Sequence, residues 1–277
     1  MTTMVWDIDP ELVKLGSISI RWYSVWIALG LIISHHVFRH IWQKEGRRAE
    51  EADLVIVVAV FFSVVGARLA HCFFYQPDYF LEHPMDILKL WQGGLASHGG
   101  FIGLFCGLAL LLRVFKNVSF LYLADRFMIS AGIVSISLRI GNLFNSEIFG
   151  RSSDAPWAIV FSRVDQVPRH PSQVYEIISY ALVLVVLIGI YLRPRLRLKP
   201  GLIFGTGLTL YSVLRILVEF TKEGQSELDQ EWAFTIGQWL SVPFTVVGLL
   251  LLLGVQKRFP HWLGGSSEPL AEDGSKP

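Results

Sequence analysis

The chain has 277 residues, of which 52% are hydrophobic and only 17% are charged, and its formal net charge at pH 7 is +1. The charged fraction lies below the roughly 25% of an average soluble domain, and apolar residues gather in runs of about 20, the length that crosses ~30 Å of hydrocarbon. This composition excludes a disordered, collagen-like or coiled-coil chain, and a net charge of +1 gives no general attraction to nucleic acid.

The sequence predicts an all-α polytopic membrane protein with about seven membrane-spanning helices and a small cap on the outer side. In chain order, the predicted spans are 21–41, 53–75, 98–115, 120–142, 171–192, 201–220 and 234–255. Residues 1–258 are expected to form one transmembrane domain with its cap at about 143–170, and residues 259–277 a polar, disordered cytoplasmic tail. No cleavable signal peptide is expected, because the first residues lack a basic segment followed by an apolar one.

The orientation follows from the basic residues in the loops. One set of connections is rich in lysine and arginine, namely Lys44, Arg47, Arg48, Arg113, Lys116, Arg193, Arg195, Arg197, Lys199, Lys257 and Arg258. The alternate connections are longer and carry fewer basic residues for their length. The positive-inside rule therefore places the first set and the C-terminus in the cytoplasm, and the N-terminus and the cap outside.

Three arginines lie in the last third of spans that run from the cytoplasm to the outside: Arg68, Arg139 and Arg215. An arginine inside a span costs at least ~2.5 kcal/mol and indicates a functional site. Guanidinium groups bind phosphate through paired donors, and phospholipid phosphates lie at this depth. A phospholipid head group is therefore the predicted ligand.

The alternative is that these arginines only tie helices together. For Arg215 this alternative is strong, because Glu219 follows one helical turn later on the same face and can pair with it. For Arg139 it is weaker, because its near neighbours are Asn142 and Asn145 rather than an acidic residue. For Arg68 the two interpretations stay open.

The other spans begin at the depth that these arginines reach. Tyr23 opens the first span, and His98 opens the third within GGLASHGG. The imidazole of His98 could act as a base or a hydroxyl donor, or it could simply cap a helix. The segment SLRIGNLFNSEIFGR adds amides and a carboxylate that can orient the hydroxyls of a polyol, at Asn142, Asn145 and Glu147, and glycines such as Gly150 that allow close backbone approach. Its alternative is a polar turn at the exit from the membrane.

Both cysteines, Cys72 and Cys106, lie inside apolar runs. They cannot build a disulfide framework, and they are far from clusters of histidine and aspartate. The sequence contains neither a metal-ligand cluster nor a nucleotide-binding loop, so no metal and no other cofactor is expected.

Six motifs occur in a fixed order: RWYSVWIALG, GARLAHCFFY, WQGGLASHGGFIG, SLRIGNLFNSEIFGR, PRHPSQVYE and YSVLRILVEFTKE. In these motifs the chain resembles the bacterial phosphatidylglycerol–prolipoprotein diacylglyceryl transferases, over nearly its whole length to about residue 258. It departs from the usual family pattern at Ala67, where a second glycine is common, and at His71, where tyrosine is common. These departures affect local helix packing and leave the motif around Arg139 intact.

The resemblance implies an enzyme of the bacterial inner membrane that transfers diacylglyceryl from phosphatidylglycerol to the lipobox cysteine of prolipoprotein signal peptides. The products would be a thioether and glycerol 1-phosphate, and the N-terminus would be periplasmic. The predicted catalytic residues are Tyr23, His98, Arg139, Arg215 and Glu219. The residues predicted to bind phosphatidylglycerol are Arg68, Arg139, Asn142, Asn145, Glu147 and Gly150.

Two other classes of protein compete with this interpretation. A lipid transporter or flippase would also explain intramembrane arginines, but it predicts internal repeats and broken helices, which the sequence does not show. A structural membrane scaffold would leave His98 and the segment 139–150 unexplained.

Overall fold

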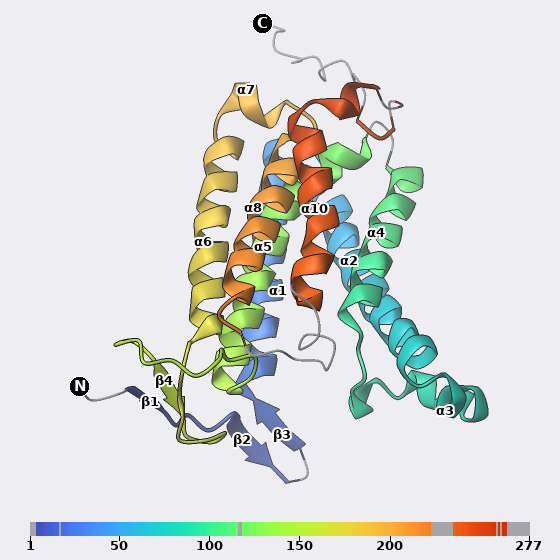
Figure 1. Ribbon diagram of the computed structural model, residues 1–277. Coiled ribbons are helices and arrows are strands. Elements are labelled where there is room, and N and C mark those ends of the chain that lie inside the picture. The colour runs from blue at the N-terminus through green and yellow to red at the C-terminus, as the bar shows by residue number, and fades with distance from the viewer. Residues whose placement is uncertain are drawn as a thin grey trace, which may run out of the picture.

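The computed structural model describes residues 4–16, 18–115, 118–222, 235–258, 260 and 262–264 (Figure 1). Five of its helices are long and apolar enough to cross a membrane: α1 (Trp22–Lys44), α2 (Ala49–Ala70) with its π-helical continuation η1 (His71–Tyr75), α5 (Phe120–Phe144), α6 (Ser172–Tyr191) and α8 (Leu202–Glu219). Two shorter apolar helices, α4 (Ser97–Val114) and α10 (Ile236–Leu252), complete the set. Each predicted span therefore contains one apolar helix, and the predicted polytopic helical fold is confirmed.

The helices run alternately up and down, so that all the loops gather at two ends (Figure 1). One end carries the connection from α1 to α2, the short helix α7 (Pro194–Arg197) and the turn η4 (Val255–Arg258). The other end carries the N-terminal strands and the connection from α2 to α4, which consists of η1, α3 (Pro77–Glu82), η2 (Pro84–Leu88) and η3 (Leu90–Gln92). We call these the basic end and the cap end.

Glycines let α2 and α4 approach each other closely. A Cβ atom on Gly103 would collide with the carbonyl oxygen of Phe62, and one on Gly66 would collide with the carbonyl oxygen of Gly99. In a membrane, where lipid is as apolar as a helix surface, such close backbone contact replaces the hydrophobic effect as a source of helix association. The pairing of α2 with α4 therefore depends on small residues.

At the basic end, buried charges tie the helices together. Arg126, which is 2% exposed, makes a two-pronged ion pair with Glu45, with Nε–Oε2 and Nη2–Oε1 distances of 2.9 and 3.1 Å. The neighbouring Asp125 is fully buried and accepts the backbone N–H groups of Gly201 and Phe204 at 2.8 and 2.7 Å. Asp125 thereby caps the start of α8, where backbone donors have no partner within the helix. These contacts fix α5 against both α1 and α8.

The cap is a small sheet. Strands β1 (Met4–Trp6), β4 (Ile159–Phe161) and β5 (Pro168–Arg169) follow the order β1-β4-β5, with Trp6 opposite Phe161 in the parallel pair. Strands β2 (Glu11–Leu15) and β3 (Ile18–Arg21) form a separate hairpin that leads into α1. The predicted cap at 143–170 thus takes one strand from the N-terminus. Arg169 pairs with Asp165 at 2.6 Å and holds the pKa of that carboxyl below its usual range.

Part of the predicted polar tail contacts the bundle at the basic end. The carbonyl oxygens of Trp262 and Leu263 accept the N–H groups of Phe120 and Leu121 at 2.8 and 3.3 Å. Residues 265–277 lie outside the described residues. The domain boundary at residue 258 stays a prediction.

The glycine contact gives a stability prediction. We expect Gly103→Ala to lower the free energy of unfolding by about 1–3 kcal/mol, because the added methyl group forces α4 away from the backbone of α2. Thermal unfolding of the purified protein in detergent measures the effect. Gly189→Ala is the matched control, because a Cβ at Gly189 of α6 meets nothing within 4 Å. Equal unfolding temperatures for the two variants would contradict the close-contact account.

Candidate active site

The C-terminal end of α5 carries the first group of predicted site residues to the cap end. Arg139 and Asn142 lie on the last turns of this helix, and Arg139 donates from Nη1 to Oδ1 of Asn142 at 3.2 Å. The chain then turns sharply, with positive φ angles of 53° at Ser146 and 58° at Ile148, a backbone region that non-glycine residues rarely adopt. Such strained backbone is often found at functional sites, where surrounding contacts hold it in place.

Gly150 shows why this segment requires a glycine. Its N–H group donates to the carbonyl oxygen of His170 at 2.8 Å, and a Cβ on Gly150 would lie 2.5 Å from the carbonyl oxygen of Thr221. The next residue, Arg151, donates its N–H to that same Thr221 carbonyl at 2.9 Å. The segment after α5 is therefore clamped between the start of α6 and the end of α8.

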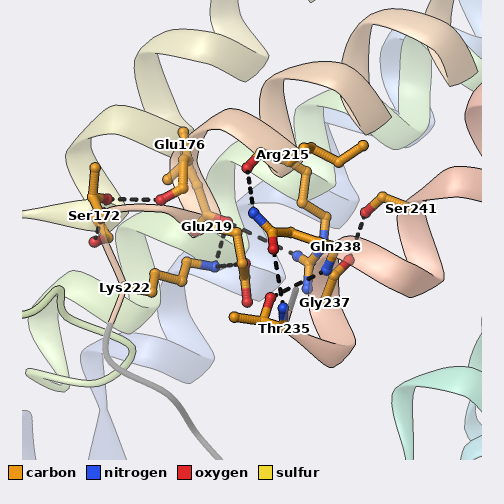
Figure 2. Close-up of polar contacts among 12 residues, drawn as sticks. Ser172, Glu176, Arg215, Glu219, Lys222, Thr235, Gly237, Gln238 and Ser241 are labelled. Atoms are coloured by element: carbon orange, nitrogen blue, oxygen red, sulfur yellow. Dashed lines mark hydrogen bonds and ion pairs between the residues drawn. The ribbon is translucent and has the colours of Figure 1, made fainter. Parts of the chain in front are cut away.

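At the centre of the site lies Glu176, which is fully buried in the second turn of α6 (Figure 2). Its Oε2 lies 3.0 Å from Nε of Arg139, and its Oε1 lies 3.0 Å from Nζ of Lys222. Nη1 of Arg215 approaches the same Oε1 to 3.9 Å. One carboxylate therefore contacts cations from α5, from α8 and from the residues just after α8.

The sequence-based site prediction included neither Glu176 nor Lys222. Glu176 carries a signal that could have found it, because a carboxylate inside an apolar span is costly and indicates a functional or paired group. Lys222 gives a weaker signal, because it follows the last turn of a span and is counted there as a loop residue. Its side chain is nonetheless only 4% exposed.

The predicted pair of Arg215 with Glu219 is wrong. Among the described residues, Glu219 forms its ion pair with Lys222, between Oε2 and Nζ at 3.1 Å, while Arg215 reaches toward Glu176. The carboxylate of Glu219 also lies directly against Gly237, in the first turn of α10, where a Cβ would collide with it. The positive end of this helix and the ammonium group of Lys222 together draw Glu219 away from Arg215.

The charges of this cluster do not balance. Counting only the part of the chain that the structure describes, three cations, Arg139, Arg215 and Lys222, face two carboxylates, Glu176 and Glu219, so these five side chains carry a net charge of +1. The side chain of Arg215 is 36% exposed, whereas those of Arg139 and Lys222 are 12% and 4% exposed. An uncompensated positive charge in a poorly solvated place favours an anion, and Arg215 is the cation that a ligand can reach most easily.

The remaining predicted residues of the 139–150 segment border this cluster. The Nδ2 group of Asn145 donates to Oε1 of Glu147 at 3.2 Å, and Tyr23 packs on Gly141, where a Cβ would lie 2.8 Å from its ring. Gln173, fully buried at the start of α6, donates to the carbonyl oxygen of Glu147 at 2.6 Å. Within the described structure, the side-chain oxygens of Asn145 and Gln173 are buried without a hydrogen-bond partner. They are free to accept the hydroxyl groups of a ligand.

Arg68 lies in a different environment, in the connection between α2 and α4. Its guanidinium group donates to the backbone carbonyl oxygens of Asp86, Ile87, Lys89, Gly93 and Gly94, at distances from 2.5 to 3.3 Å. It is 4% exposed and lies over the ring of Phe80 at 5.1 Å. For Arg68 this geometry favours the structural alternative over phosphate binding, which stays a prediction.

His98 lies in the first turn of α4, and its side chain is exposed. No hydrogen bond or ion pair joins it to the cluster around Glu176 within the part of the chain that the structure describes. The described residues likewise contain no group of three or more His, Cys, Asp or Glu side chains placed to hold a metal ion.

Comparison with known proteins identifies the family. A family model described as prolipoprotein diacylglyceryl transferase matches residues 10–254. The chain belongs to this family. It is 41% identical to the phosphatidylglycerol–prolipoprotein diacylglyceryl transferase of Tolumonas auensis over 250 residues, which cover 90% of this chain and 96% of that protein. It is 39% identical to the protein of the same name from Chloroherpeton thalassium, with 89% and 92% coverage.

The predicted family and the predicted transferase activity are therefore confirmed, and the chain is a multi-pass membrane enzyme. The roles of individual residues in the transferase stay predictions. The structure joins Arg139, Asn142, Arg215 and Glu219 to one charged cluster, and it adds Glu176 and Lys222 to them.

Arg139 tests whether the cluster recognises its ligand through paired donors. We expect Arg139→Lys to lower kcat/KM by about 10- to 100-fold, because an ammonium group keeps the charge but cannot hold Glu176, Asn142 and a ligand at fixed angles. Steady-state transfer assays measure the effect. Arg163→Lys, at an exposed ion pair in the cap, is the control and should keep normal turnover. Normal turnover of Arg139→Lys would contradict this account.

Substitution of Glu176 tests whether its carboxylate is needed to offset the three cations of the cluster. We expect Glu176→Gln to destabilise the protein by about 3 kcal/mol, because three cations then share one carboxylate. Adding Lys222→Met returns the cluster to a net charge of +1. The double variant should therefore regain much of the decrease in unfolding temperature that Glu176→Gln causes. If the double variant were less stable than Glu176→Gln alone, repulsion among the cations would not be the cause.

Proposed function

We propose that the cluster of Arg139, Arg215 and Lys222 binds the phosphate of phosphatidylglycerol in the outer leaflet of the bacterial inner membrane. The observation that carries the proposal is the surplus positive charge around the buried Glu176 carboxylate, at the end of the bundle that holds the cap. A phosphodiester brings the single negative charge that would neutralise this cluster. The acyl chains would then extend along the apolar helices.

The glycerol head group would lie beside this phosphate. Its hydroxyl groups can donate to the unpaired side-chain oxygens of Asn145 and Gln173, and Asn142 and Glu147 lie on the same segment. Tyr23, which packs on Gly141 two residues after Arg139, would lie beside this head group. These contacts would distinguish a polyol head group from a bare phosphate ester.

The acceptor is proposed to be the lipobox cysteine thiol of a prolipoprotein signal peptide. In the reaction, a bond forms between the sulfur and the terminal glycerol carbon of the diacylglyceryl group, and the bond from that carbon to the phosphate oxygen breaks. Glycerol 1-phosphate leaves with the bonding electrons, and the thiol gives up its proton. Arg139 and Arg215 would stabilise the charge that develops on the leaving phosphate.

The thiol must lose its proton to become a good nucleophile, and nearby positive charge favours the thiolate. His98 is the predicted group for taking up the proton or for donating a hydrogen bond to a hydroxyl. Because it lies on α4, away from the charged cluster, the substrates would have to lie between α4 and the cluster for His98 to act. Glu219, paired with Lys222, would hold that ammonium group in position.

We further propose that the basic end faces the cytoplasm and that the N-terminus and the cap are periplasmic. The α1–α2 connection, α7 and η4, whose sequences are rich in arginine and lysine, lie at one end of the bundle (Figure 1), and this matches the pattern expected of a cytoplasmic face. The partners are then the two substrates and the lipid bilayer, and the near-neutral chain gives no reason to expect nucleic acid.

A direct assay tests the proposed reaction. Purified protein is incubated with head-group-labelled phosphatidylglycerol and a lipobox peptide, and mass spectrometry follows the peptide. We expect a diacylglyceryl thioether on the cysteine and an equal amount of labelled glycerol 1-phosphate. The matched control is the same peptide with serine in place of cysteine. A product on the serine peptide, or release of label without peptide modification, would contradict thiol-dependent transfer.

The orientation gives a separate prediction. We expect green fluorescent protein fused after Lys257 to fluoresce, because it folds in the cytoplasm. Alkaline phosphatase fused at the same position should be inactive, because it requires the periplasm. The opposite pattern would place the cap in the cytoplasm and would remove the proposed access to outer-leaflet lipid.

A further inference from the structure

The connection between α2 and α4, residues 71–96, forms an arm at the cap end of the bundle. It contains η1, α3, η2 and η3, and α3 projects to the side at the foot of α2 (Figure 1). The proposed chemistry uses none of these residues, and the arm begins three residues after Arg68, which lies in the last turn of α2.

The surface of the arm is unusually apolar. Phe74 and Trp91 are 83% and 79% exposed. The other exposed large apolar or aromatic residues of the arm are Phe73, Tyr75, Tyr79, Leu81, Met85, Leu88, Leu90 and Leu95. So many exposed apolar side chains in one short segment are rare on a protein face that meets water, and they indicate a contact with lipid or with another protein.

The surface of the arm continues the lipid-facing surface of the bundle. Val57 on α2 and Ile102 on α4 are 65% and 67% exposed, and both lie on apolar helices of a membrane protein. The arm joins the ends of these two helices, and the exposed side chains of Phe73 and Phe74 lie within four residues of the last residue of α2. This continuity favours lipid as the occupant.

The polar groups of the arm fit the boundary between hydrocarbon and water. The Tyr79 hydroxyl donates to Asp86 at 2.7 Å, and Lys89 pairs with Asp86 at 2.5 Å. Tyrosine and tryptophan are enriched at this depth of a bilayer, because an apolar ring and a polar group are satisfied there together.

Arg68 holds the arm in place. Its guanidinium group donates hydrogen bonds to five backbone carbonyl oxygens between residues 86 and 94. It also packs on Phe80, which is 5% exposed and forms the core of the arm. No neutral side chain, and no ammonium group, offers donors in the same planar arrangement.

We propose that the arm lies in the interface of the leaflet at the cap end, with Phe74, Leu88 and Trp91 against lipid, and that Arg68 fixes it there. This placement is independent of the phosphate-binding cluster. It would anchor the end of α2 and the start of α4, which carries His98, at a constant depth in the membrane.

Environment-sensitive probes test the placement. In a chain with Cys72→Ala and Cys106→Ala, single cysteines are introduced by Leu88→Cys or Trp91→Cys, labelled with the fluorophore NBD, and reconstituted in nanodiscs of phosphatidylethanolamine and phosphatidylglycerol. We expect blue-shifted emission at both positions, and loss of most of the fluorescence when the lipids carry a nitroxide near the head group. The control is Val164→Cys, an apolar position in the cap that is 46% exposed.

Two outcomes would overturn lipid as the occupant. One is emission at positions 88 and 91 that matches position 164 and resists the lipid nitroxide. The other is emission at positions 88 and 91 that is typical of water and shifts to the blue only when a lipobox peptide is added. That result would assign the surface to the peptide. Both readouts are independent of transferase activity, so they can fail while the proposed function holds.

The role of Arg68 has its own test. With the probe at position 91, we expect Arg68→Lys to reduce the quenching by lipid nitroxides and the fluorescence anisotropy, because one ammonium group cannot hold five carbonyl oxygens. Arg39→Lys, on the exposed side of α1 at the other end of the bundle, is the control for loss of an arginine. Unchanged quenching and anisotropy in Arg68→Lys would show that the guanidinium group does not hold the arm.

Discussion

The buried carboxylate of Glu176 is the constraint on which the rest of the site depends. Three cations surround it, and they come from α5, α8 and the residues that follow α8. Without a carboxylate at this point, mutual repulsion would drive the cations apart in a medium where charges are weakly screened. With it, the site keeps a net positive charge and still allows the helices to pack. The same group thus supports the fold and, in the function proposed above, the attraction for an anionic lipid.

Much of the site was predictable because membrane topology restricts where residues can lie. Helices that alternate in direction bring the ends of even-numbered spans to one level, so the depth of Arg139 and Arg215 follows from the sequence alone. Side-chain pairing does not, because it depends on how each helix is rotated about its axis. The pairing of Glu219 with Lys222 rather than Arg215 arises in this way, since Gly237 of α10 lies against the carboxylate.

Arg68 shows the limit of arguments from depth. It satisfies the same sequence criterion as Arg139, yet its donors are taken up by the backbone of the connection that follows it. An irregular connection leaves many carbonyl oxygens without partners, and an arginine at its base can satisfy several of them at once. Hydropathy does not reveal such a role. A three-residue strand such as β1 is equally hidden, because it is too short to show a periodic pattern.

The parallel pairing of β1 with β4 has a consequence for biogenesis. Residues 4–6 pair with residues 159–161, and four membrane-spanning segments separate the two strands. Synthesis proceeds at about 5–20 residues per second, so the first strand must wait on the order of ten seconds before its partner emerges. During that time strand β1 stays without its partner strand. The sheet of the cap therefore forms late in assembly. It can form only when the first four segments have inserted so that β1 and β4 lie on the same side of the membrane.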